Sequence, residues 1–242
     1  MELSLLLAHL CLLPNGIYET HPEMCKIVSA LIHFFFLACF TFMFLEAIHL
    51  YALIGWVVRR YEKPCPFDVK KKDKRKSHFF FSDGIMSKGQ NILMGWLIPM
   101  IIVMFNLCFE YDNYGGQYHC WLQMNTSLIY GQFVPIAFLT ITSLAIIEAA
   151  GNAEEFKKLD NVNEEERKNA KVMQRTLILI LPLVFATFLL GTLAEYDQNV
   201  VLYSIWTLFN GILGVLIFVC HCSTNEVTRS KLIALKKRIC RK

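Results

Sequence analysis

The sequence predicts an all-α fold, a polytopic bundle of transmembrane helices. Of the 242 residues, 55% are hydrophobic and only 18% are charged. The apolar residues come in blocks of about twenty, which is the length needed to cross a bilayer core of about 30 Å. The polar connections are alternately basic and nearly free of Lys and Arg, as cytoplasmic and outer loops are. We expect six spans and a cytoplasmic tail, at about 3–18, 27–58, 92–109, 128–149, 176–194, 200–222 and 223–242.

The first segment, 1–18, is short for a span, and Pro14-Asn15-Gly16 interrupts its apolar run. It differs from a signal peptide because its leading charge is Glu2 rather than a basic residue, and no small-residue cleavage site follows. We interpret the segment as a helix whose cytoplasmic end is missing or very short.

The stretch from Cys25 to Arg60 is the longest apolar run, and we expect the bundle to be organised around it. At about 1.5 Å per residue, this helix is longer than the bilayer core. Glu46 and His49 interrupt it. An ionisable residue at membrane depth costs about 2.5 kcal/mol or more unless it faces a bundle interior, a cavity or a partner. The helix should therefore lie inside the bundle.

The later spans contain residues that shape membrane helices. Pro99, Pro135 and Pro182 each fall within a span, where proline is tolerated. Pro182 marks either a point of flexing or a fixed bend. The last span contains Asn210 close to two glycines. Small residues allow close helix approach, so we expect Asn210 to form a hydrogen bond across a helix interface.

The basic residues set the predicted orientation. The connections 59–90 and 151–175 and the tail are rich in Lys and Arg, whereas the other connections contain Lys26 alone. Both termini are therefore predicted to be cytoplasmic. The dense basic cluster 69–76 either attracts anionic membrane lipid or only fixes orientation. The net charge of +4 is carried by loops that flank the membrane, so we expect no nucleic-acid partner.

Nine cysteines are present, but their positions do not indicate a disulfide scaffold. Cys25 and Cys120 fall on the predicted outer side, and together they make a plausible disulfide. The others lie in spans or on the cytoplasmic side, where thiols stay reduced. Asn125 begins a glycosylation sequon on the outer side.

The motifs of the common enzyme classes are not found in this sequence. Glu46-x-x-His49 is half of a di-iron motif, but no second copy exists. The seven histidines show no clustered metal-ligand spacing. Phosphate-binding glycine motifs and a nucleophile elbow are also missing. We expect no enzyme, no metal and no cofactor. A transporter is disfavoured because we find no clear internal repeat.

In its order of motifs the chain resembles the membrane region of an adhesion-type G-protein-coupled receptor, which is related to the secretin-type hormone receptors. Residues 3–8 resemble the start of the family's second helix, and Cys25 with the run that follows it resembles the third. There, Glu46 and His49-Leu50-Tyr51 match the family's Leu-Glu-Gly-x-His-Leu-Tyr pattern. The other matching segments are Gly95 to Pro99 in the fourth helix, Cys120-Trp121-Leu122 in the second outer loop, and Phe209-Asn210, Gly214 and Phe218 to Cys222 in the seventh helix.

The sequence also departs from the family pattern. Its six spans correspond to helices two to seven, so the first helix and the extracellular region with the tethered agonist are expected to be absent. The sixth helix usually has Thr-Trp-x-Phe-Gly, and Phe188 stands here where the tryptophan would be. Leu213 takes the place of a glutamine in the seventh helix, and the connection 59–91 is longer than usual.

The resemblance implies a receptor, located at the plasma membrane, that passes a signal from an extracellular or tethered peptide agonist to a heterotrimeric G protein. It implies agonist contacts at Trp121 and Phe188, and we expect Phe34 to reach the same cavity. It also implies structural and signalling roles for Glu46, His49, Tyr51 and Asn210. The rival interpretation is a truncated, non-signalling membrane protein that acts as a partner or dominant-negative form of a full-length receptor.

Overall fold

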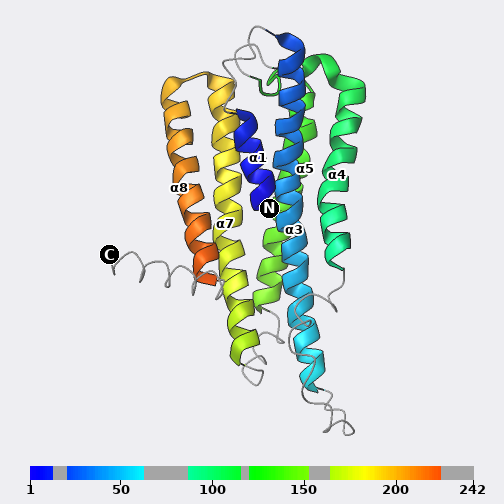
Figure 1. Cartoon of the computed structure of the whole chain (residues 1–242), viewed down its shortest axis with the longest axis vertical. Coiled ribbons are helices and arrows are strands. Elements are labelled where there is room, and N and C mark those ends of the chain that lie inside the picture. The colour runs from blue at the N-terminus through cyan, green and yellow to red at the C-terminus, as the bar shows by residue number, and fades with distance from the viewer. Residues whose placement is uncertain (13–20, 63–86, 116–119, 153–163, 225–242) are drawn as a thin grey trace, which may run out of the picture. The chain divides into compact units, whose positions relative to one another are not determined.

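The computed structural model describes residues 1–12, 21–62, 87–115, 120–152 and 164–224 (Figure 1). Within these ranges it contains helices and no strand, so the predicted all-α fold is confirmed. The chain divides into two compact units, Met1–Leu159 and Asp160–Lys242. The α-helices are α1 (Glu2–Leu12), α3 (Pro22–Glu62), α4 (Lys88–Glu110) and α5 (Leu128–Asn152) in the first unit, and α7 (Glu164–Asp197) and α8 (Val200–Thr224) in the second.

Five of these helices contain apolar segments long enough to cross a membrane. They agree with five of the predicted spans in position, but α3 and α7 extend further into polar sequence than the apolar blocks alone indicate. The helix in the first predicted span, α1, has 11 residues. At about 1.5 Å per residue it covers roughly half of a bilayer core. Residues 13–18 of that predicted span lie outside the described residues.

In the first unit, α3 is the central helix and packs against α1, α4 and α5. Six consecutive residues, 36–41, are buried on it. A helix that is buried all round must have neighbours on several sides, whereas a peripheral helix buries only one stripe. The prediction that the long helix lies inside a bundle therefore agrees with the structure of this unit.

Close approach between helices of this unit depends on glycine. A Cβ added at Gly95 of α4 would overlap the ring of Phe42 on α3, and one added at Gly131 of α5 would overlap the side chain of Asn106 on α4. Small residues let membrane helices approach until side chains of one contact the backbone of the other. The two glycines thus fix how α4 packs between its neighbours.

One face of α4 is apolar and exposed. Ile101, Phe105 and Phe109 are 59%, 64% and 72% exposed. Their spacing of four residues places them on one face of the helix. In a membrane helix such a face contacts lipid, because lipid tails solvate apolar side chains well.

The second unit is a helical hairpin of α7 and α8. The turn between them contains Gln198 with φ of 52°. The Asn199 side chain accepts a hydrogen bond of 2.9 Å from the backbone N–H of Val201, at the start of α8. Asparagine is a favoured residue at this capping position because it satisfies an N–H that has no partner within the helix.

Candidate functional site

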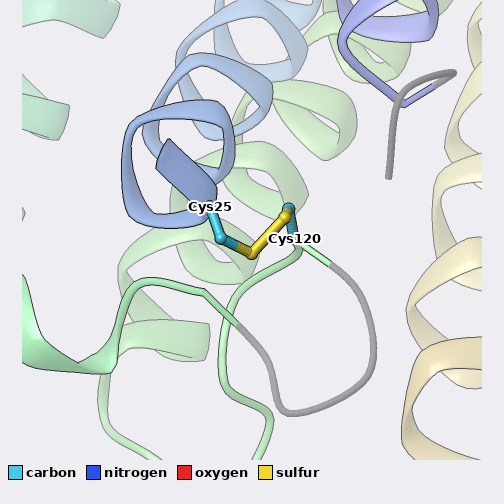
Figure 2. The surroundings of a disulfide bond; sticks show 2 residues. All are labelled: Cys25 and Cys120. Carbon is cyan, nitrogen blue, oxygen red and sulfur yellow. A yellow bond between two sulfur atoms is a disulfide. The ribbon is translucent and has the colours of Figure 1, made fainter. Parts of the chain in front are cut away.

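The sulfur atoms of Cys25 and Cys120 form a disulfide at one end of the first unit. Figure 2 shows it joining the first turn of α3 to the loop between α4 and α5. The two Cα atoms are 4.9 Å apart, although 95 residues separate them in sequence. α3 begins, α4 ends and α5 begins at this end, which we call the outer end because the sequence predicts that its connections lie outside. The expected disulfide is present in the structure.

The loop after α4 is also held by hydrogen bonds close to the disulfide. Tyr114 and Leu122 form an isolated antiparallel bridge, and the backbone N–H of Gln123 donates a 3.2 Å hydrogen bond to the Asn113 carbonyl. Ser127, just before α5, donates a hydrogen bond of 2.6 Å to the Glu110 carboxylate. These contacts close the loop on itself.

Exposed contacts join the start of α3 to this loop. The Lys26 ammonium lies 3.1 Å from the Asp112 carboxylate, 3.5 Å from that of Glu23 and 4.5 Å from the centroid of the Tyr111 ring. The Tyr111 hydroxyl donates a 2.8 Å hydrogen bond to Glu23. Exposed ion pairs contribute little stability, so these contacts mainly orient the loop.

The inner face of the loop is buried. Tyr114 is hydrogen-bonded through its hydroxyl to Nδ1 of His33, at 3.0 Å, and the two rings are stacked. Burial raises the pKa of Tyr114, so its hydroxyl stays protonated. The Trp121 ring lies against Phe36, with 5.6 Å between centroids. The loop therefore inserts two aromatic side chains against the central helix.

Phe34 occupies a different position from the one expected. Its ring stacks on Trp96 of α4 at 5.7 Å between centroids. Phe36, two residues later, contacts Trp121 instead. Two residues rotate a helix by about 200°, so the two phenylalanines lie on nearly opposite faces. Sequence reasoning missed Phe36 because the run Phe34-Phe35-Phe36 contains no polar residue that would fix its phase.

The residues of the Leu-Glu-Gly-x-His-Leu-Tyr match lie nearer the other end of α3. Glu46 and His49 are half-buried, and their expected roles stay predictions. Tyr51 is 52% exposed, so the expectation that it belongs to the helix core is corrected for this residue. The buried face of this part of α3 passes through Ala47, Leu50 and Ile54, and Tyr51 is turned about 100° from Leu50.

In the second unit, Phe188 of α7 is buried and 1% exposed. The Asn210 side chain of α8 donates a 3.0 Å hydrogen bond to the Trp206 carbonyl one turn earlier in its own helix. The predicted bond from Asn210 across a helix interface stays a prediction.

In the first unit, Asn125, the sequon residue, is exposed in the loop before α5.

In the part of the chain that the structure describes, no three His, Cys, Asp or Glu side chains lie close enough together to bind a metal ion.

Comparison with known families assigns the architecture. The family model described as 7 transmembrane receptor (Secretin family) matches residues 4–67 and 78–217, which is most of the chain. The chain belongs to this family. The match includes Cys25, Cys120, Trp121 and Phe188.

The similar curated proteins include adhesion G-protein coupled receptors. Adhesion G-protein coupled receptor D1 of Homo sapiens is 24% identical over 231 residues, covering 95% of this chain and 24% of that protein. Adhesion G protein-coupled receptor L1 of Bos taurus is 27% identical, covering 93% of this chain and 14% of that protein. Cadherin EGF LAG seven-pass G-type receptor 1 of Homo sapiens is 25% identical, covering 90% of this chain and 6% of that protein.

The chain spans less than a quarter of the length of each of these three relatives. The predicted resemblance to adhesion-type receptors is confirmed. Family membership and five span-length helices make this chain a multi-pass membrane protein of the receptor class.

Proposed function

We propose that this chain transmits an extracellular signal to a heterotrimeric G protein, in response to a peptide agonist that is tethered or free. The observation that carries the proposal is the placement of Trp121 against Phe36 of α3, in a loop fixed by the Cys25–Cys120 disulfide. The resemblance implies that the outer-loop tryptophan contacts an apolar agonist peptide. An agonist that contacts Trp121 therefore acts on a side chain already packed on the central helix.

The physical mechanism is a two-state bundle. An agonist shifts the equilibrium only by binding one state better than the other. Trp121 packs on Phe36 of α3. Phe36 comes ten residues before Glu46, which is about 15 Å along the helix. Because α3 is continuous from Pro22 to Glu62, a change in its packing at Phe36 can alter the packing around Glu46 and His49.

The resemblance implies an agonist contact at Phe188 as well as at Trp121. Phe188 keeps the bulk of the family's tryptophan but lacks the indole N–H. A net hydrogen bond is worth about 1 kcal/mol, which changes a two-state equilibrium several-fold. This substitution leads us to expect little signalling from the chain.

We propose an orientation in the plasma membrane with the disulfide end outside and both termini in the cytosol. Two independent features support it. Disulfides persist in oxidising compartments, and the connections at the disulfide end contain no basic residue except Lys26. Cysteine labelling in intact cells should reach a probe at Gly116 but not one at Ser77. The reverse result would overturn the orientation.

The signalling proposal is tested with a fusion that supplies an upstream helix and an agonist segment. We expect G-protein activation to rise above that of the unfused chain, and Trp121→Ala to abolish the rise. Phe36→Ala should reduce activation strongly because it removes the aromatic partner of Trp121. Phe34→Ala should reduce activation less, because the Phe34 ring stacks on Trp96 instead.

Surface expression of every variant is measured in parallel, so that loss of folding is separated from loss of signalling. Equal effects of Phe34→Ala and Phe36→Ala at equal surface levels would contradict an agonist site at the outer loop. A fusion that reaches the surface but stays silent with several agonist segments would support the rival function, a non-signalling partner of a full-length receptor.

A further inference from the structure

Four buried side chains at the outer end of the first unit have polar atoms without hydrogen-bond partners. They are Ser29 and His33 of α3, Trp121 of the loop and Gln132 of α5. The unpartnered atoms are Ser29 Oγ, His33 Nε2, the Trp121 indole nitrogen and both amide atoms of Gln132. Trp121 is 3% exposed and the other three are 0% exposed. Nearly all such groups in native proteins bind another protein group or ordered water.

Helix spacing and neighbouring contacts place these four residues around the same part of α3. Ser29 and His33 are four residues apart, so they lie on one face of α3, about 6 Å apart along its axis. The Gly131 carbonyl of α5 lies beside the His33 ring, although Nε2 itself makes no hydrogen bond. Gln132 is the next residue along α5. Trp121 packs on Phe36, which lies one turn beyond His33.

The donor and acceptor chemistry describes what would bind there. The indole nitrogen only donates, the Gln132 amide both donates and accepts, and the Ser29 hydroxyl does both. A matching guest must therefore also both donate and accept hydrogen bonds. Left unpartnered, each such buried group costs about 1–3 kcal/mol.

The surroundings indicate a neutral guest. Buried neighbours in sequence, Ile32, Leu128 and Ile136, are apolar. Among the described residues the buried charged side chain is Glu195, which belongs to the second unit. A buried charge without a compensating partner is strongly unfavourable, so an ion does not fit.

We propose that Ser29, His33 and Gln132, together with the Trp121 indole, form a binding site for ordered water beneath the outer loop. Water is small, neutral, and both a donor and an acceptor, and buried water molecules typically make about three hydrogen bonds. The Tyr114 hydroxyl occupies Nδ1 of His33 and leaves Nε2 for water. Water bound there links α3, α5 and the loop through one set of hydrogen bonds.

The test is radiolytic hydroxyl-radical labelling of the full chain in lipid nanodiscs, with water enriched in oxygen-18 and readout by mass spectrometry. Radicals generated from bound water oxidise adjacent side chains even where bulk solvent has no access. We expect Trp121 to be labelled, while Met43, which is 0% exposed and lies in the apolar core of α3, stays unlabelled. Trp121 labelled no faster than Met43 would overturn the proposal.

Variants decide whether the label comes from this site. The double variant Ser29→Ala/Gln132→Met should lower Trp121 labelling several-fold. Thr140→Val is the matched control: Thr140 is buried two turns further along α5, and its hydroxyl donates to the Ile136 carbonyl of its own helix. It should leave the labelling unchanged. Unchanged labelling in the double variant, with the chain folded, would show that solvent enters by another route and would overturn the proposal.

Thermal unfolding provides a second readout. Gln132→Met replaces the amide by an apolar side chain of similar size. If the amide binds water, this variant removes one hydrogen-bond partner of that buried water, and the melting temperature falls. A rise in melting temperature would mean that Gln132 is simply unsatisfied, and would exclude the water site.

Discussion

The connection between α4 and α5 and the turn between α7 and α8 both join a pair of antiparallel apolar helices, but they are stabilised differently. The first uses partners far away in sequence: a disulfide across 95 residues and the bond from Tyr114 to His33, 81 residues away. The second uses neighbours, namely the Asn199 cap and a 2.5 Å hydrogen bond from Tyr203 to Glu195.

The difference shows what a short turn achieves without help. Only two residues join α7 to α8, so the ends of the two helices stay close together. Local hydrogen bonds therefore suffice to fix this turn. A long loop has many alternative conformations, and loop closure cost grows with length. The outer loop therefore needs covalent and hydrogen bonds to α3 to hold Trp121 in place. Changes to distant contacts should loosen the outer loop alone, and changes to local packing should loosen the hairpin alone.

The largest effect is expected from Cys120→Ser. Loss of the disulfide removes about 4–5 kcal/mol of stability in the chain-entropy model for a loop of this length. Hydrogen exchange measured by mass spectrometry should show faster exchange in 111–127 and unchanged exchange at the α7–α8 turn. Equal loss of protection at both places would contradict the separation of the two regions.

The converse change is Gly191→Ala in α7. A Cβ at this position would lie 2.7 Å from the Trp206 indole nitrogen of α8, so the Trp206 ring must move. Overpacking of this kind typically costs about 1–3 kcal/mol. We expect faster exchange at the start of α8 with the outer loop unaffected. Gly211→Ala is the matched control, because a Cβ there meets no atom within 4 Å.

The smallest effects are expected from changes to two of the contacts that hold the outer loop on α3. Tyr114→Phe removes the buried hydrogen bond to His33 and should cost about 1–3 kcal/mol, because it leaves a buried ring nitrogen unpaired. Lys26→Met removes exposed contacts and should produce no measurable change in melting temperature. A larger loss for Lys26→Met than for Tyr114→Phe would mean that the exposed charges, rather than the buried pair, hold the loop.

The sequence was sufficient to predict the helical fold, the placement of α3 within its unit and the cysteine pair. Apolar blocks, interrupting polar residues and the segregation of Lys and Arg each report directly on membrane depth or side. Cys25 and Cys120 were recognisable because both fall in connections poor in basic residues, outside the spans.

The site itself was less accessible from sequence. The rotation of α3 about its axis decides that Phe36 rather than Phe34 contacts Trp121. A run of three phenylalanines does not indicate which of them is on the face that is turned toward the loop. One signal was present but unused. Ser29, His33 and Phe36 follow a spacing of four and three residues, which marks one face of a helix and includes the only two polar residues of that stretch. Gln132 and Tyr114 join this face through tertiary contacts that no local pattern encodes.

The Cys25–Cys120 bond also makes a covalent ring of everything between these residues, including α4 and the basic segment before it. A protease that cuts the chain once within that ring leaves the two pieces joined through sulfur. Such a nicked molecule migrates as one polypeptide under non-reducing conditions and separates only after a reductant is added. Limited digestion between these two cysteines would therefore reveal whether the bond is intact.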